Sequence, residues 1–210
     1  MKVLFIADNE YLRKFVEKKF NFQGITIIQS DDVNFKSKIE EDWDFLLSLH
    51  CRKIIPKNVL DKTRCYNLHP GIFPLGRGVM PYIFAIINKE KAGCTLHRMT
   101  ENLDRGYIID QKEIEIDPWD TGDSLQKKIL KEETILLLKN FKSLLNGSYD
   151  KIVDPEGGFT RNMKDFQKLL QIQDIKTIDI LRALSKKNWN NAYILDGENK
   201  IYLHLITKKN

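Results

Sequence analysis

The chain has 210 residues and 42% hydrophobic residues, which suits one mid-sized domain with an appendage, and it has no apolar run long enough to cross a bilayer. The net charge of +5 is spread along the chain beside helical patterns, so no nucleic-acid partner is expected. Three cysteines without a C-x-x-C pair, in a chain with no evident signal peptide, indicate a reduced, cytoplasmic protein.

The first predicted elements alternate between strand and helix. Residues 2–7 indicate a buried strand, residues 10–20 an amphipathic helix and residues 25–29 a second strand, which together open an α/β fold. No G-x-G-x-x-G follows the first strand, so NAD is not implied. The apolar residues 45–47 predict another strand. His50 and Arg52 follow it, at the edge where open parallel sheets bind ligands.

The next stretch combines three polar residues that suit chemistry. Residues 64–68 predict a strand closed by Pro70 and Gly71, so Asn67 and His69 share one face at its carboxyl end. Asp104 lies in a turn at residues 102–106, between strand-like runs at 94–99 and 107–111. A turn Asp or a single His beside Pro is usually structural, and the combination of the three is what indicates an active site.

These residues and their neighbours resemble a known signature. Asn67, His69 and Asp104, within residues 67–71 and 103–106, are similar to the Asn, His and Asp of formyltransferases that use 10-formyltetrahydrofolate. Residues 48–56 and 70–81 resemble the branch that formylates amino groups on nucleotide-linked sugars. The resemblance covers about residues 43–135 well. It implies a Rossmann-like formyltransferase core and catalytic roles for the three residues.

The chemistry of formyl transfer assigns each residue a task. The reaction needs attack on a carbonyl, a tetrahedral oxyanion and removal of a proton from the amine. The Asn67 amide can donate to the oxyanion, and His69 can take the proton as general base. Asp104 either holds the imidazole in position or orders a water that relays the proton, and the sequence leaves both roles open.

Other residues are candidate contacts for the two substrates. A short helix is predicted at residues 81–88, and the glycine-rich turn before it suggests contact with a substrate phosphate. Where the sugar branch often has Asn and Trp, this chain has Gly76 and Val79, so the resemblance does not extend to acceptor stacking by Trp. The assigned candidates are His50, Arg52, Arg77 and Gly78 for the acceptor and Ile72, Phe73 and Pro74 for the folate, with no metal.

The C-terminal part is predicted as an extension of the core. Residues 124–145 indicate a long helix that residues 146–148 stop, which places the core at residues 1–147 and the extension at 148–210. The extension combines a loop at 154–158, helical pieces up to residue 184 and a terminal β-hairpin signal. An isolated hairpin needs a partner surface, so it either packs on the core or pairs across a dimer, and the resemblance to the sugar branch favours a homodimer. Phe159, Arg161 and Asp165 are left without a role.

The expected acceptor is TDP-4-amino-4,6-dideoxyglucose or a 3-amino analogue, formylated for O-antigen or other surface glycan synthesis. Phosphoribosylglycinamide formyltransferase remains an alternative, as does a non-catalytic nucleotide-sugar binding protein on the same fold. A tRNA-binding role is disfavoured because the tail is short and weakly basic. A zinc module built from Cys65, His69, Cys94 and His97 is the remaining rival.

Overall fold

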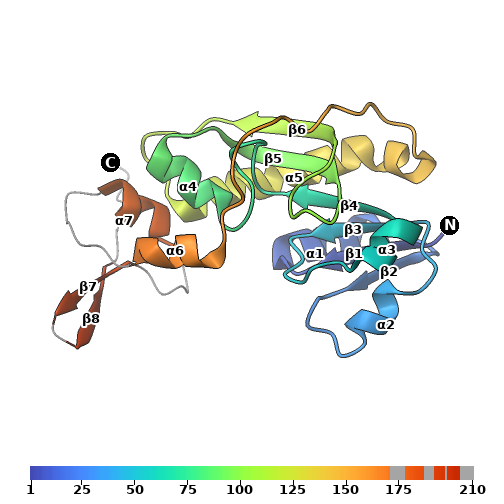
Figure 1. The fold of residues 1–210 in the computed structure, drawn as a ribbon, viewed down its shortest axis with the longest axis horizontal. Coiled ribbons are helices and arrows are strands. Elements are labelled where there is room, and N and C mark those ends of the chain that lie inside the picture. The colour runs from blue at the N-terminus through green and yellow to red at the C-terminus, as the bar shows by residue number, and fades with distance from the viewer. Residues whose placement is uncertain (171–177, 187–191, 197, 204–210) are drawn as a thin grey trace.

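A mixed sheet forms the centre of the computed structural model, which describes residues 1–170, 178–186, 192–196 and 198–203. Its strand order is β2-β1-β3-β4-β5-β6 (Figure 1). The strands are β1 (Val3–Ala7), β2 (Ile25–Ile28), β3 (Phe45–Leu49), β4 (Arg64–His69), β5 (Ala92–Arg98) and β6 (Ile108–Ile114). The first four in sequence run parallel, whereas β5 pairs antiparallel with both β4 and β6. The carboxyl ends of β1, β3 and β4 therefore share one edge.

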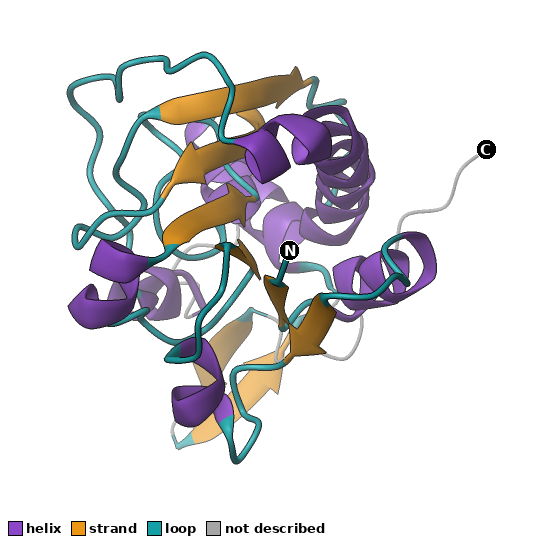
Figure 2. Cartoon of the chain, turned by 90° about the vertical axis from the view of Figure 1, so that its right-hand side faces the viewer, coloured by secondary structure: helices purple, strands orange, loops and turns teal. Residues whose placement is uncertain are grey.

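Helices cover both faces of the sheet (Figure 2). They are α1 (Glu10–Lys19), α2 (Phe35–Ile39), α3 (Lys57–Lys62), α4 (Pro81–Asn88), α5 (Gly122–Asn146), α6 (Met163–Leu170) and α7 (Ile178–Leu184). Apolar residues of α1, α4 and α5 form the larger core on one face, and those of α2 and α3 form a smaller core on the other. Strands β1 and β3 are buried on both faces, in keeping with their apolar sequences, which only Ser48 of β3 interrupts.

The long helix α5 has strong signals at both ends. The Thr121 hydroxyl accepts a hydrogen bond from the Ser124 N–H (3.1 Å), and the Ser124 hydroxyl accepts one from the Thr121 N–H (2.9 Å). Gly147, with φ of +68°, ends the helix in the left-handed conformation. The prediction of a helix stopped at residues 146–148 is confirmed.

The segment after α5 returns across the sheet. Ile152 bridges to Ile108 of β6, and Arg161 bridges to Gly78. Figure 1 shows this segment passing along β6 before it enters α6. We call residues 154–161 the strap. Residues that follow it in the extension complete the same core as the sheet: Phe166, Ala183, Leu184 and Ala192.

Two strands lie near the end of the described chain. β7 (Tyr193–Asp196) pairs antiparallel with β8 (Asn199–Tyr202). The part of the expected hairpin beyond residue 203 lies outside the described residues. Among the helices that the structure describes, none is long and apolar enough to span a membrane.

Candidate active site

The three predicted catalytic residues lie together at the carboxyl end of β4. Asn67 and His69 project from the same face of this strand, and the loop between β5 and β6 brings Asp104 to them. The Asn67 Nδ2 donates to Asp104 Oδ1 at 3.4 Å, and His69 Nδ1 is 3.5 Å from the same oxygen. His69 is 5% exposed and Asp104 is 8% exposed. A nearly dry site of this kind strengthens each electrostatic contact.

A backbone carbonyl fixes the orientation of His69. Its Nε2 lies 2.6 Å from the carbonyl oxygen of Gly76. A carbonyl only accepts, so Nε2 carries the hydrogen, and Nδ1 holds the lone pair when the ring is neutral. The basic nitrogen of His69 is therefore the one that faces Asp104. Gly76 was not among the predicted site residues.

Asp104 is held by the glycine-rich turn after β4. It has the left-handed φ of +51°, which suits Asp at a tight turn. Its Oδ2 accepts a hydrogen bond from the Gly78 N–H at 2.8 Å. The Gly78 N–H is thus already used, and a Cβ on Gly78 would meet the Arg161 carbonyl oxygen at 1.9 Å. The observed role of the Gly78 N–H is to support Asp104, and the predicted contact of Gly78 with substrate stays a prediction.

The Arg77 side chain is also occupied by contacts within the protein. Its side chain is 0% exposed, and each of its five N–H groups has an acceptor. The acceptors are the carbonyls of Asp104, Pro74, Gly157 and Pro155 and the carboxylate of Asp154. All five N–H groups of Arg77 are already used, so this arrangement lends no support to the prediction that Arg77 contacts a substrate phosphate. Arg77 joins the catalytic turn to the strap.

A second arginine joins the same two segments from the side of the strap. Arg161 of the strap is buried and donates to the Leu75 carbonyl at 2.7 Å and to both carboxylate oxygens of Glu90 at 2.6 and 2.8 Å. Its backbone carbonyl accepts from the Val79 N–H at 3.0 Å. Sequence reasoning left Arg161 unassigned, because nothing local indicates a contact 86 residues away.

A further histidine lines the back of the site. His97 lies directly opposite Asn67 in the pairing of β4 with β5, and its ring is 4.9 Å from that of Phe73. Its Nδ1 donates to the Arg98 carbonyl at 3.0 Å, which leaves the lone pair on Nε2. Among the described residues, neither Nε2 of His97 nor Oδ1 of Asn67 has a hydrogen-bond partner. Burial lowers the pKa of His97 to about 4. Strand alternation in residues 94–99 could have placed His97 on this face.

The residues predicted to bind folate differ in accessibility. Ile72 and Phe73 are buried, whereas Pro74 is half-buried. The Phe73 ring packs on His69 at 5.5 Å and under the Arg77 guanidinium at 4.7 Å. Ile72 and Phe73 are therefore parts of the wall behind the site, and of the three only Pro74 is open to a ligand.

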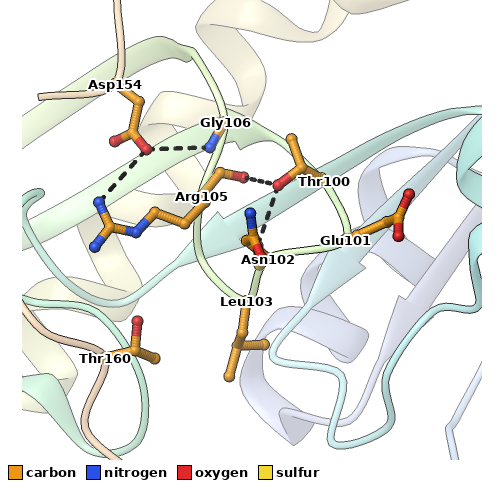
Figure 3. A pocket seen from close by; sticks show the side chains of 8 residues that line it. All are labelled: Thr100, Glu101, Asn102, Leu103, Arg105, Gly106, Asp154 and Thr160. Carbon is orange, nitrogen blue, oxygen red and sulfur yellow. Dashed lines mark hydrogen bonds and ion pairs between the residues drawn. The ribbon is translucent and has the colours of Figure 1, made fainter. Parts of the chain in front are cut away.

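An open cavity of about 750 Å³ adjoins the loop that carries Asp104 (Figure 3). Asp154 holds one side of it, accepting from the Gly106 N–H at 3.4 Å and facing Arg105 at 3.9 Å. The lining residues are Thr100, Glu101, Asn102, Leu103, Arg105, Gly106, Asp154 and Thr160. Asp104 is the member of this loop that does not line the cavity, since its side chain points to His69 and Asn67.

His50 and Arg52 follow β3 at the same edge of the sheet. His50 Nε2 lies 2.9 Å from Oε1 of Glu133, a residue of α5 that was not predicted for the site. The backbone N–H of Arg52 donates to Asp8 at 2.8 Å, and its side chain is exposed. The Arg52 guanidinium therefore remains a candidate contact for an anionic substrate.

The two cysteines of the zinc alternative lie in different cores, although its two histidines are neighbours, with ring centroids 6.4 Å apart. Cys65 belongs to the core beneath α2 and α3, whereas Cys94 belongs to the core beneath α5. Both thiols are free, and burial raises the pKa of Cys65 to about 11. Within the described part of the chain, no group of three or more His, Cys, Asp or Glu side chains is arranged to hold a metal ion.

A partly buried Asn67 beside the buried His69 and Asp104, at the edge of this α/β sheet, suits a transferase that acts on a carbonyl carbon. Residues 14–141 match the family described as formyl transferase, and the chain belongs to that family. It is 33% identical over 177 residues to a dTDP-4-amino-4,6-dideoxyglucose formyltransferase of Mycobacterium bovis, covering 81% of this chain and 76% of the relative. Its relatives thus include sugar N-formyltransferases.

Solved structures agree with this assignment. A sugar N-formyltransferase from Shewanella sp. FDAARGOS_354 matches with a TM-score of 0.87 and 31% identity, covering 100% of this chain and 98% of the other. A formyltransferase from Anoxybacillus kamchatkensis, in complex with UDP-4,6-dideoxy-4-formamido-L-AltNAc and tetrahydrofolate, matches with a TM-score of 0.71 and 26% identity, covering 87% and 97%. The predicted family and α/β formyltransferase fold are confirmed.

Proposed function

We propose that this formyltransferase moves the formyl group of 10-formyltetrahydrofolate to the amino group of a nucleotide-linked amino-deoxy sugar. The observation that carries the proposal is the position of Asn67 and His69, each within 3.5 Å of Asp104 Oδ1. TDP-4-amino-4,6-dideoxyglucose is the first acceptor to consider, because the M. bovis relative is named for it. A 3-amino analogue is the second.

In the first step the neutral amine nitrogen attacks the formyl carbon. A C–N bond forms, and the π electrons of the carbonyl move to its oxygen. The Nδ2 of Asn67 donates a hydrogen bond to this oxyanion, and a preorganised donor of this kind contributes about 10²–10³ in rate. Asn67 is therefore assigned to the oxyanion.

The proton of the amine goes to Nδ1 of His69. The carbonyl of Gly76 holds the opposite nitrogen, so the ring is already oriented when the proton arrives. The imidazolium that forms lies beside the Asp104 carboxylate, which stabilises the new positive charge. In this arrangement Gly76 orients the ring, and Asp104 acts mainly through its charge.

In the last step the tetrahedral intermediate collapses. The C=O bond is restored, and the bond from the formyl carbon to N10 of the folate breaks. N10 takes the proton from the His69 imidazolium, so the products are the N-formyl sugar and tetrahydrofolate, and the imidazole is neutral again.

The two substrates are assigned to opposite sides of the trio. Arg52, exposed after β3, suits the diphosphate of the nucleotide. The 750 Å³ cavity and the half-buried Pro74 suit the folate, whose planar pterin ring can use the backbone polar groups of the loop at 100–106. The folate contacts predicted for Ile72 and Phe73 are replaced by this cavity.

The proposal is tested by incubating the protein with 10-formyltetrahydrofolate and a panel of TDP-linked 3-amino and 4-amino dideoxy sugars. The expected product is heavier than the acceptor by about 28 mass units, the mass of an added carbonyl, and His69→Ala is the matched blank. Turnover of glycinamide ribonucleotide without turnover of any sugar would instead assign the protein to that reaction. Binding of TDP without turnover would favour the non-catalytic alternative.

The proposal extends to the setting of the enzyme. A homodimer is supported by the exposed apolar side chains on β7 and β8, among them Leu195 and Tyr202. A cytoplasmic location and a role in O-antigen or other surface glycan synthesis are in keeping with the proposed substrates. Mass measurement in solution tests the homodimer, and the glycan composition of a deletion strain tests the role in surface glycan synthesis.

A further inference from the structure

A carboxylate lies in the core on the α5 side of the sheet. Glu133 is 0% exposed and occupies the apolar stripe of α5, one turn from Ile129 and one turn from Leu137. A buried charge is costly unless it is paired and hydrogen-bonded. A Glu in the apolar stripe of a helix therefore indicates a specific task.

The Glu133 carboxylate has one partner atom among the described residues, Nε2 of His50. Both carboxylate oxygens of Glu133 contact Nε2 of His50, at 2.9 and 3.1 Å. A carboxylate only accepts, so Nε2 carries the hydrogen, and the ring orientation is fixed by this contact. The Nδ1 of His50 has no hydrogen-bond partner among the residues that the structure describes, and the side chain is 15% exposed.

The backbone of His50 supports the same arrangement. His50 directly follows Leu49, which pairs with Leu68 of β4, so it leaves the sheet beside His69. Its φ of +63° is in the left-handed region, which a residue with a Cβ adopts at a cost. The chain turns at this point and the imidazole reaches Glu133, although a regular strand end would direct it elsewhere.

An exposed arginine follows His50 at this edge of the sheet. Arg52 is exposed two residues after His50. The pKa of Lys186, after α7, is lowered mainly by burial and further by the charge of Arg52, whereas Asp123 opposes the shift. The exposed Arg52 guanidinium would attract an anionic ligand to this edge.

We propose that Glu133 is a positioning residue that holds His50 through Nε2 and thereby presents Nδ1 to the diphosphate of the acceptor substrate. The inference rests on the proposed function, since it assigns a contact within that substrate. In the complex the ring is doubly protonated, because the carboxylate on one side and the phosphate oxygen on the other both only accept. Such a ring bridges two anions, and Glu133 keeps it in register.

The test measures the affinity of TDP alone by titration calorimetry in four proteins: the wild type, Glu133→Gln, His50→Phe and the double variant. Glu133→Gln retains an acceptor for Nε2 and removes the charge. We expect it to weaken TDP binding about tenfold, as loss of one charge-assisted hydrogen bond does. His50→Phe should weaken binding at least as much, and Glu133→Gln should add nothing in the His50→Phe background.

Kinetics and spectroscopy separate positioning from a general effect on folding. We expect Glu133→Gln to raise KM for the acceptor, with kcat and KM for the folate unchanged. Long-range ¹H–¹⁵N spectra should report a hydrogen on Nε2 of His50 in the wild type. Glu132→Gln, one residue along the helix and half-buried, is the matched control and should leave every readout unchanged.

The outcomes distinguish this inference from the proposed function. If the wild type binds no TDP, the acceptor class itself is wrong. If it binds TDP and Glu133→Gln weakens binding equally with and without His50, Glu133 is a structural residue only, and the inference is overturned. Unchanged TDP affinity in His50→Phe would also overturn it. Should Glu133→Gln fail to fold, Glu133→Asp, which keeps the charge and shortens the side chain, takes its place.

Discussion

The imidazole of His69 lies between two acceptors, the Gly76 carbonyl at 2.6 Å and the Asp104 carboxylate at 3.5 Å. The shorter contact fixes the ring, and the longer one leaves Nδ1 available for a proton. A ring held in this way does not have to reorient during turnover, so this part of the barrier is paid before the substrate binds.

Removal of the His69 or the Asn67 side chain, both on β4, should slow the chemical step. We expect His69→Ala and Asn67→Ala to lower kcat by about 10²–10³ or more, because both side chains act on the transition state. TDP affinity and the thermal midpoint of unfolding should stay close to those of the wild type. Rates near normal in both variants would refute the assigned mechanism.

His97 should make stability depend on pH. Its pKa is lowered to about 4 by burial, below the ordinary value, so the unfolded chain binds a proton that the folded chain rejects. The stabilisation is complete above the unfolded pKa and is lost as the pH falls toward the folded one. Between about pH 7 and about pH 5 we expect a loss of about 2 kcal/mol from this group.

Urea unfolding of the wild type and of His97→Phe at these two pH values measures the effect. Phe keeps a ring beside Phe73 and cannot titrate. The variant should therefore lose less stability than the wild type on acidification, even if it is less stable at neutral pH. An equal loss in both proteins would show that His97 is not the group responsible.

Side chains with a local signal could be predicted, and those defined by distant contacts could not. Strand alternation places Asn67 and His69 on one face of β4, whereas Asp104, 37 positions after Asn67, joined them in the prediction through the resemblance to the formyltransferase signature. The contact with the Gly76 carbonyl has no sequence signature, because every residue has a backbone carbonyl. The partner of His50 is 83 positions away, and the sequence offers only a Glu within an apolar stripe.

At the level of elements, the turn after β4 and the strap exchange arginines. Arg77 of the turn donates hydrogen bonds to Gly157 and Asp154 of the strap, and Arg161 of the strap donates one to Leu75 of the turn. Gly76 and Gly78, which hold His69 and Asp104, flank Arg77 directly. The geometry of the catalytic residues therefore depends on a segment more than 75 residues further along the chain.

Removal of the Arg77 guanidinium should reduce both stability and activity. We expect Arg77→Met to cost about 3 kcal/mol of unfolding free energy, since it leaves the Asp154 carboxylate and several carbonyls without their donor. The kcat should also fall, because the turn that holds His69 and Asp104 loosens. Urea unfolding and steady-state kinetics measure the two effects.

Arg105→Met is the matched control for this variant. Arg105 faces the same Asp154 at 3.9 Å but is partly exposed, so its loss should cost about 1 kcal/mol or less. If the two variants proved equally stable, the contacts of Arg77 with the strap would not support the catalytic turn.

Elements with a continuous or periodic apolar pattern could be predicted from the sequence, and elements without one could not. The strand β1 and the helices α4 and α5 lie where the pattern places them. The helices α2 and α3 were missed because each has only five or six residues and no side-chain cap. Packing against the smaller core, rather than propensity, makes these two segments helical.

At the scale of the whole molecule, one core continues into the C-terminal extension. Phe166 of α6 and Leu184 of α7 belong to the same cluster as the sheet. The proposed boundary at residue 147 therefore marks the end of a helix and no break in packing. Sequence patterns place such a boundary by turn signals, which do not report what packs on what.

The exposed face of β7 and β8 leads to a prediction about assembly. Leu195 and Tyr202 are exposed there, and Tyr202 lies opposite Tyr193. A two-stranded ribbon is marginal alone, so we expect a dimer with twice the mass of one chain in light scattering, and a monomer for Leu195→Glu. Glu198→Gln, near the turn, should stay dimeric. A monomeric wild type at high concentration would refute the dimer.

The crossed arginines also predict how the enzyme responds to a protease. The chain is exposed at Lys151, before the strap, which is where an interdomain linker would ordinarily be cut and its two pieces released. Here the Arg77 guanidinium of the first piece would still bind the second piece, and the Arg161 guanidinium of the second would still bind the first. The two pieces would also share one hydrophobic core. We therefore expect a chain nicked after Lys151 to stay assembled, with its formyltransferase activity retained, and to separate only in denaturant.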